Sequence, residues 1–329
     1  MFDLFFQSPA GSPLLWGTFF AVVLVMLALD LGVFHRQEHV VGSKEAAIWT
    51  AVWIGLSLAF NAWIWIEDGK QPALEFLTGY LIEKSLSVDN IFVFIVLFDY
   101  FRVPRQYHHR VLFWGILGAL VMRALFIGIG AALVSRFDWI LYAFGAFLVY
   151  TGYKIVRDKG TEIDPAHNPV VRFFQRFVPL THEYHGKHFL VRHQGALMAT
   201  PLLLVLVVVE ATDVVFAVDS IPAIFGVTTD PFLVFTSNIF AILGLRALYF
   251  LLADLMGRFR YLPYGLGAVL VFIGLKMLVH DWVHVPIEVS LGGVVLLLGA
   301  AVAASLLWPG EAPDEPPPTP PEEPPDTGV

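Results

Sequence analysis

Long runs of apolar residues dominate the chain, and polar residues gather between them. A helix needs about 20 apolar residues to cross the hydrocarbon core of a bilayer. A helix packed on a soluble core would carry a polar face, which these runs lack. The pattern therefore predicts an all-α, polytopic transmembrane bundle of about nine spans. We place the spans at 14–34, 46–66, 74–98, 109–134, 137–155, 196–218, 232–253, 264–283 and 286–308.

Two segments break this pattern. Residues 156–195 are polar and form one long connection, with a short amphipathic helix expected around Val170–Phe177 at the membrane interface. Residues 309–329 are rich in proline and acidic residues, and such a segment cannot bury enough apolar surface to fold. We therefore expect a membrane domain over residues 1–308 and a disordered tail over 309–329.

The distribution of Lys and Arg predicts the orientation. Connections on alternate sides of the predicted bundle differ sharply in basic residues, and the richer side is expected to be cytoplasmic. This rule places the N-terminus outside and the C-terminus in the cytoplasm. The outer side holds Lys70 and Arg136. The inner side holds Arg36, Lys44, Arg102, Arg105, Arg110, Arg157, Lys159, Arg172, Arg176, Lys187, Arg192, Arg258 and Arg260.

Three short motifs occur twice and in the same order. The pairs are Glu83–Ile91 with Asp213–Ile221, Arg123–Phe126 with Arg246–Tyr249, and Gly145–Lys154 with Gly267–Lys276. They define two units of three spans, at about 74–155 and 196–283. Because three is odd, the second unit enters the membrane from the opposite side, and inverted repeats of this kind are typical of secondary transporters. The alternative is an old duplication that is kept only for packing.

Charged residues interrupt several predicted spans, where each costs at least about 2.5–3.5 kcal/mol. The acidic ones are Asp30, Glu83, Asp89, Glu210, Asp213 and Asp219, and the basic ones are Lys84, Arg123 and Arg246. The excess of carboxylates requires bound protons or a bound cation. A divalent cation with shared protons fits this balance.

The types of side chain narrow the ion. Carboxylate, amide and hydroxyl oxygens suit Mn²⁺, Mg²⁺ and Ca²⁺, whereas softer ions prefer thiolate or imidazole ligands. Composition does not choose among the three hard ions. The candidate metal ligands are Glu83, Asp89, Asn90, Glu210, Asp213, Asp219 and Ser220, with Asn61 and Asn238 as further candidates that could equally link helices. Each acid could instead form a salt bridge, and we read Arg123 and Arg246 as counter-charges.

Helical geometry refines this prediction. On an ideal helix Glu83 and Asn90 share one face of the third span, and Asp89 lies about 120° away from it. In the sixth span Asp213 and Ser220 share the corresponding face, and Asp219 lies about 120° away from that face. Both aspartates would reach one cavity if the helix unwinds, and Pro222 predicts such a break.

Composition excludes some chemistry. The chain has no cysteine, so it offers no disulfide, no thiolate metal site and no dithiol redox centre. It contains 57% hydrophobic and 15% charged residues, with a net charge of −8. Nothing resembles a nucleotide-binding motif, which argues against transport driven by ATP, and we expect neither an enzyme nor a nucleic-acid partner. The loop histidines His182, His185, His188 and His193 could sense metal, but a solvated loop is the interpretation that we favour.

The acidic motifs resemble those of a known family. The stretches EKSLSVDNIFVF (83–94) and EATDVVFAVDSIPAIFGVTTDPFLVFTSNIFAILGLRALYF (210–250) are similar to the TerC family of bacterial integral membrane proteins, in particular its Alx-like members. The resemblance extends over about 14–308. It implies a fold like that of the LysE transporter superfamily and manganese export across the inner membrane, and it links the chain to tellurium resistance.

Carried onto this sequence, the resemblance assigns transport to Glu83, Asp89, Asp213 and Asp219, with Asn90, Ser220 and Glu210 beside them. No cofactor is expected beyond the transported ion, and the expected partners are that ion and the lipid bilayer. Two other functions stay open, namely export of another cation such as Ca²⁺ and a membrane scaffold without transport activity.

Overall fold

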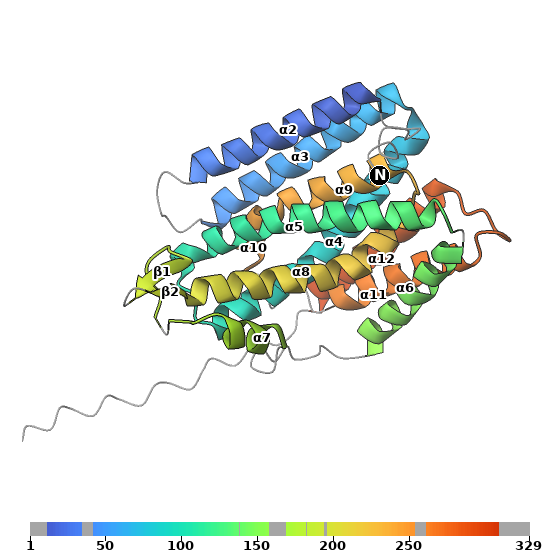
Figure 1. The fold of residues 1–329 in the computed structure, drawn as a ribbon. Coiled ribbons are helices and arrows are strands. Elements are labelled where there is room, and N and C mark those ends of the chain that lie inside the picture. The colour runs from blue at the N-terminus through green and yellow to red at the C-terminus, as the bar shows by residue number, and fades with distance from the viewer. Residues whose placement is uncertain are drawn as a thin grey trace, which may run out of the picture.

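The computed structural model describes residues 12–34, 42–137, 139–157, 169–181, 183–193, 196–253 and 261–308. Long helices lie side by side along one direction and form a bundle (Figure 1). The bundle helices are α2 (Pro13–Phe34), α3 (Ser43–Glu67), α4 (Lys70–Tyr100), α5 (Arg105–Val134), α6 (Trp139–Arg157), α8 (Pro201–Phe225), α9 (Pro231–Leu243), α10 (Leu245–Ala253), α11 (Leu262–Leu278) and α12 (Ile287–Leu307). The connection between α6 and α8 holds α7 (Pro169–Phe177), β1 (Leu190–His193) and β2 (Ala196–Ala199).

The helices have the length and composition of membrane spans. Within the described ranges, 5 helices (α3, α5, α6, α8 and α12) are long and apolar enough to cross a bilayer. If the bent pair α9–α10 is counted as one span, the number rises to 6. The apolar segment Pro13–Leu27 of α2 and the apolar helix α11, Leu262–Leu278, fall below that length. The 31-residue α4 is a continuous helix, but Glu83, Lys84 and Asp89 interrupt its apolar sequence. A mostly helical membrane protein is confirmed, whereas the number nine and the repeat stay predictions.

The apolar surface of the bundle faces outward as well as inward. Only 28% of the apolar stretch of α3 is buried, and Ile48, Val52 and Leu58 are among its exposed side chains. Large exposed apolar surfaces are unfavourable in water. This surface therefore fits contact with lipid.

Aromatic side chains hold the first two helices against the bundle. Phe19 of α2 and Phe60 of α3 both contact Phe240 of α9, with ring centroids 5.8 Å and 4.8 Å apart. Phe76 of α4 lies 6.0 Å from the same ring. Aromatic pairs at such distances add to the free energy of burial. The α2–α3 pair therefore packs onto both α4 and α9, and Figure 1 shows α2 and α3 together along one side of the bundle.

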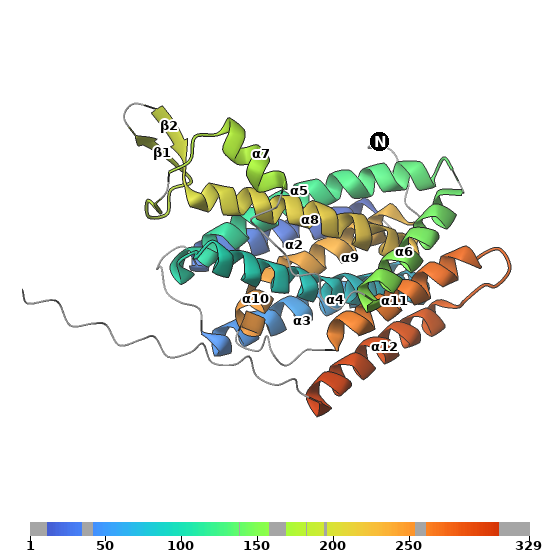
Figure 2. The same ribbon diagram turned by 90° about the horizontal axis from the view of Figure 1, so that it is seen from below.

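The connection between α6 and α8 differs in part from the prediction. The amphipathic helix is confirmed as α7, which lies with the strands at one end of the bundle (Figure 2). The two antiparallel strands pair Leu190 with Ala199 and His193 with Ala196. The fold class stays all-α, with one short hairpin in a connection, and residue 196 does not begin a span. Pro201 starts α8 instead, because the residue before a proline is driven to an extended conformation.

The predicted break at Pro222 is also wrong. Helix α8 continues through Pro222 to Phe225, and the Gly226 N–H closes the last turn by donating to the Pro222 carbonyl at 3.0 Å. Proline has no N–H to donate, so the Val218 carbonyl loses its usual donor, but the helix persists on both sides of Pro222. The break lies elsewhere, at Gly244, where α9 and α10 meet at 41°.

Helices α6 and α11 cross at their glycines. A Cβ atom on Gly145 would lie 2.9 Å from the Gly274 carbonyl oxygen, and one on Gly152 would lie 2.5 Å from the Gly267 carbonyl oxygen. The contacts are reciprocal in both pairs. The two backbones can approach this closely only because no side chain intervenes.

This crossing predicts a position-specific loss of stability. Gly152→Ala should destabilise the protein by about 1–3 kcal/mol, because the new methyl group would meet backbone atoms that cannot move aside. Gly55→Ala is the matched control, since a Cβ atom there meets nothing within 4 Å. Thermal unfolding of the two variants in detergent measures the difference. Equal unfolding temperatures would contradict the close contact.

Candidate functional site

A buried arginine links the two acidic motifs. Arg123 of α5 is 1% exposed and forms an ion pair with Glu83 of α4. Its Nη2 and Nε atoms also donate to the two carboxylate oxygens of Asp213 in α8, at 3.2 Å and 3.4 Å. Such two-point contacts fix geometry as well as charge. Glu83 and Asp213 are therefore salt-bridge partners of Arg123, the alternative that the sequence left open for each acid.

Asn238 of α9 completes this network. Its side-chain oxygen accepts from Arg123 Nη1 at 3.1 Å, and its amide nitrogen donates to Glu83 Oε2 at 3.2 Å. Asn238 thus links helices, as one of its two predicted roles requires. The network joins α4, α5, α8 and α9 and contains two carboxylates for one guanidinium.

A cavity of about 390 Å³ lies beside the network, between α4, α6, α8 and α11. We call it the Asp89 cavity, and its polar lining residues are Glu83, Asp89, Asn90, Asp219 and Ser220. The remaining lining residues are Leu86, Phe92, Val93, Ile155, Phe216, Pro263 and Leu270. The two aspartates therefore share one cavity although both helices are continuous. No unwinding is needed, because α4 and α8 pack against each other.

Several oxygen atoms in this cavity lack protein partners. Asp89 forms neither a hydrogen bond nor an ion pair with another described residue, and the Ser220 hydroxyl is buried without a hydrogen bond among them. Most helical hydroxyls in the bundle behave differently: Thr78, for example, donates to the Leu74 carbonyl at 2.7 Å. Unpaired buried polar groups cost free energy unless water or a ligand satisfies them.

Asp219, in contrast to Asp89, has polar neighbours within the protein. Thr151 and Lys154 of α6 are its hydrogen-bonding and charged neighbours. Lys154 is exposed near the end of α6, so its attraction is partly screened by solvent. Asp219 therefore keeps its access to the Asp89 cavity.

Other candidates lie outside the cavity. Glu210 is directed at Gly118 of α5, one turn before Asp213. Asn61 is half-buried in α3, and the buried Arg246 belongs to α10. Lys84 donates from Nζ to the Ala241 carbonyl at 3.1 Å, where α9 ends. The described residues bring none of these four side chains to the Asp89 cavity, and the side chain of Asp30 lies outside the description.

The histidine-rich loop provides no metal cluster in the described part of the chain. His185 and His188 are exposed. His182 and the side chain of His193 lie outside the described residues. Across all the described ranges, no group of three or more His, Cys, Asp and Glu side chains could hold a metal ion. A cation in the Asp89 cavity would therefore use two aspartates, neutral oxygens and its own water.

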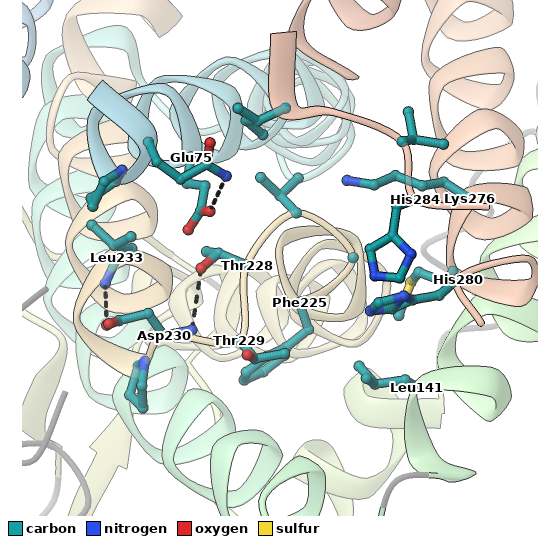
Figure 3. A pocket seen from close by; sticks show the side chains of 18 of the residues that line it. Glu75, Leu141, Phe225, Thr228, Thr229, Asp230, Leu233, Lys276, His280 and His284 are labelled. Carbon is teal, nitrogen blue, oxygen red and sulfur yellow. Dashed lines mark hydrogen bonds between the residues drawn. The ribbon is translucent and has the colours of Figure 1, made fainter. Parts of the chain in front are cut away.

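Sequence reasoning missed a second cavity of about 570 Å³ (Figure 3). We call it the Glu75 cavity, and its ionisable lining residues are Asp68, Glu75, Asp230, Lys276, His280 and His284. They come from the connections 68–69, 226–230 and 279–286 and the adjoining helix ends. Glu75 lies inside the predicted span 74–98, and a carboxylate within an apolar span was the sequence feature that could have indicated this cavity.

Comparison with known proteins places these motifs in a family. The family model described as "Integral membrane protein TerC family" matches residues 68–311. An "Uncharacterized membrane protein STKORF319" of Myxococcus xanthus is 55% identical over 303 residues, which cover 92% of this chain and 95% of that protein. A "Putative membrane-bound redox modulator Alx" of Escherichia coli K12 is 54% identical over 301 residues, covering 89% and 94%.

A more distant relative, an "Uncharacterized membrane protein" of Rickettsia bellii, is 38% identical over 292 residues, covering 89% and 97%. No solved structure matches the chain. The family match spans both acidic motifs, the buried Arg123 and the residues that line the Asp89 cavity. The chain belongs to the TerC family of integral membrane proteins.

Proposed function

We propose that this protein exports a divalent cation, in the first place Mn²⁺, across the bacterial inner membrane through the Asp89 cavity. The observation that carries the proposal is the pairing of repeat-related residues in that cavity. Asp89 corresponds to Asp219, and Asn90 corresponds to Ser220, in the two acidic motifs. All four residues line the same space, from α4 and from α8.

The division of charges supports a cation site. Arg123 pairs with Glu83 and Asp213, so these two carboxylates share one permanent counter-charge. Asp89 has none among the described residues, and Asp219 has only the exposed Lys154 nearby. A divalent cation between two aspartates would neutralise both, while Asn90 and Ser220 offer neutral oxygen ligands that suit hard cations.

Contacts between the repeat units support an inverted arrangement. Gly145 corresponds to Gly267, and Gly152 corresponds to Gly274, in the third repeated motif. The contact of Gly145 with Gly274 is therefore the counterpart of that between Gly267 and Gly152, as a twofold axis between α6 and α11 requires. In transporters built this way, the substrate site lies between the repeats near the middle of the membrane.

The placement of the connections supports alternating crossings. Connections 68–69, 226–230 and 279–286 meet around the Glu75 cavity. The opposite end holds the connection 101–104, where the Tyr184 hydroxyl donates to the Phe101 carbonyl at 2.7 Å. Most of the basic residues outside the spans belong to the connections at that opposite end, which supports a cytoplasmic position for this end and an outside N-terminus.

The printed name of the E. coli relative describes a redox modulator. The present chain has no cysteine, so thiol exchange within it is unavailable. Movement of a metal ion needs no such group. A role as a membrane scaffold without transport would leave the unpaired oxygens of the Asp89 cavity unexplained.

The proposal predicts uptake of Mn²⁺ into inverted membrane vesicles, whose cytoplasmic face is outside. Vesicles that contain the protein should accumulate labelled Mn²⁺ faster than matched vesicles without it. Excess unlabelled Mn²⁺, Ca²⁺ and Mg²⁺ added separately would rank the ions. Stronger competition by Ca²⁺ than by Mn²⁺ would reassign the substrate, and equal uptake in both vesicle types would reject transport.

A further inference from the structure

The two cavities lie on the same helices. In α4, Gln71 and Glu75 line the Glu75 cavity, whereas residues 83–93 contribute to the Asp89 cavity. In α8 the Glu75 cavity takes Phe225, and the Asp89 cavity takes residues 216–220. In α11 the corresponding segments are 276–277 and 263–270. The two cavities are therefore stacked along three shared helices.

An apolar layer separates them. Ile82 of α4, Ala223 of α8 and Ile273 of α11 lie between the two lining segments of their helices and are 1%, 0% and 2% exposed. They belong to one contiguous apolar cluster. Apolar constrictions exclude water and block ions, and channels use them as gates. The structure thus has its two cavities closed off from each other.

The Glu75 cavity has a negative lining. Glu75 and Lys276 extend into it from different helices, and the rings of His280 and His284 lie side by side with centroids 5.2 Å apart (Figure 3). Three carboxylates face one lysine. Burial, with the nearby charges of Asp230 and Glu67, raises the pKa of Asp68 above its usual value. Such a lining raises the local concentration of cations.

The same lining is too dispersed to hold an ion tightly. Among the described residues no three metal-binding side chains converge there or elsewhere. Conduction requires ion binding that is weak enough for release. A negatively lined space without a converging ligand set meets that requirement at the end of a path.

We propose that the Glu75 cavity is the exit vestibule of the divalent-cation path, and that the Ile82–Ala223–Ile273 layer is the barrier that closes it from the Asp89 cavity. This inference rests on the proposed export function and extends it. During export the layer parts, the cation passes from Asp89 and Asp219 to the vestibule, and the acidic lining receives it outside the membrane core.

Single cysteines test this path without background, because the natural chain has none. Thr229→Cys lies in the vestibule at an exposed position, and Leu86→Cys lies in the Asp89 cavity. Ser135→Cys is the matched control, since it is exposed at the α5–α6 connection and outside both cavities. Intact cells are treated with membrane-impermeant methanethiosulfonates that carry either a positive or a negative charge.

We expect the reagents to label Thr229→Cys and Ser135→Cys but not Leu86→Cys. A positive adduct at Thr229→Cys should slow Mn²⁺ efflux by about tenfold more than a negative adduct does, equivalent to about 1.4 kcal/mol of repulsion. Neither adduct should change efflux at Ser135→Cys. Labelled Thr229→Cys with unchanged efflux would remove the vestibule from the path.

The barrier is tested by labelling alone, without reference to transport. Ile273→Ala should increase the rate at which outside reagent reaches Leu86→Cys, whereas Val294→Ala, in the same cluster but on α12, should not. Rapid labelling of Leu86→Cys with the layer intact would refute the barrier. If the natural protein moved no Mn²⁺ while the labelling pattern held, the export function would fail and the barrier would stand.

Discussion

Replacing Asp89 or Asp219 with asparagine is expected to abolish Mn²⁺ efflux and to leave the amount of folded protein nearly unchanged. Both carboxylates line the Asp89 cavity, and neither takes part in the buried Arg123 network. A unit charge pair 4 Å apart contributes about 4 kcal/mol at an effective dielectric constant of about 20, so losing one carboxylate should weaken cation binding at least a hundredfold.

The measurement is the manganese content of cells that produce each variant at equal membrane levels and are challenged with excess manganese. Asp99→Asn is the matched control, because it makes the same change on the same helix at an exposed position. Cells with Asp99→Asn should keep full tolerance. Full tolerance with both Asp89→Asn and Asp219→Asn would reject the Asp89 cavity as the transport site.

Substitutions in the Arg123 network are expected to lower the stability of the protein, and any loss of transport would follow from that. Removing one partner of a buried ion pair costs about 3–5 kcal/mol, since the other charge stays in the protein interior. Glu83→Gln and Asp213→Asn should therefore lower the unfolding temperature in detergent and the membrane level. Arg123→Met should be the most severe, because it leaves two buried carboxylates without their cation.

A double-mutant cycle separates this network from the transport site. Arg123→Met combined with Asp213→Asn should be less destabilising than the sum of the two single changes, because the two residues contact each other. Asp89→Asn combined with Arg123→Met should be close to additive. If Glu83→Gln folded normally and lost efflux, Glu83 would act as a cation ligand despite its ion pair.

The sequence predicted which acidic residues belong to the site, but not which of them pair with Arg123 and which line the Asp89 cavity. Sequence spacing identified Glu83, Asp89, Asp213 and Asp219 together, because buried acids in apolar spans are costly and stand out. Spacing says nothing about which acid Arg123 reaches, since that depends on how α5 packs against α8 and α9. The Glu75 cavity was missed for a related reason: its residues come from three connections that are far apart in the sequence.

What the sequence determined by itself is the membrane class, the helical content and the repeated acidic motifs. These follow from the length of the apolar runs and from residue spacing, which act locally along the chain. The tertiary structure decided that Glu83 and Asp213 share Arg123, that Asp89 and Asp219 face one cavity, and that Gly244 bends a helix where Pro222 does not. Those outcomes depend on which helices pack together, because a buried charge takes its partner from a neighbouring helix.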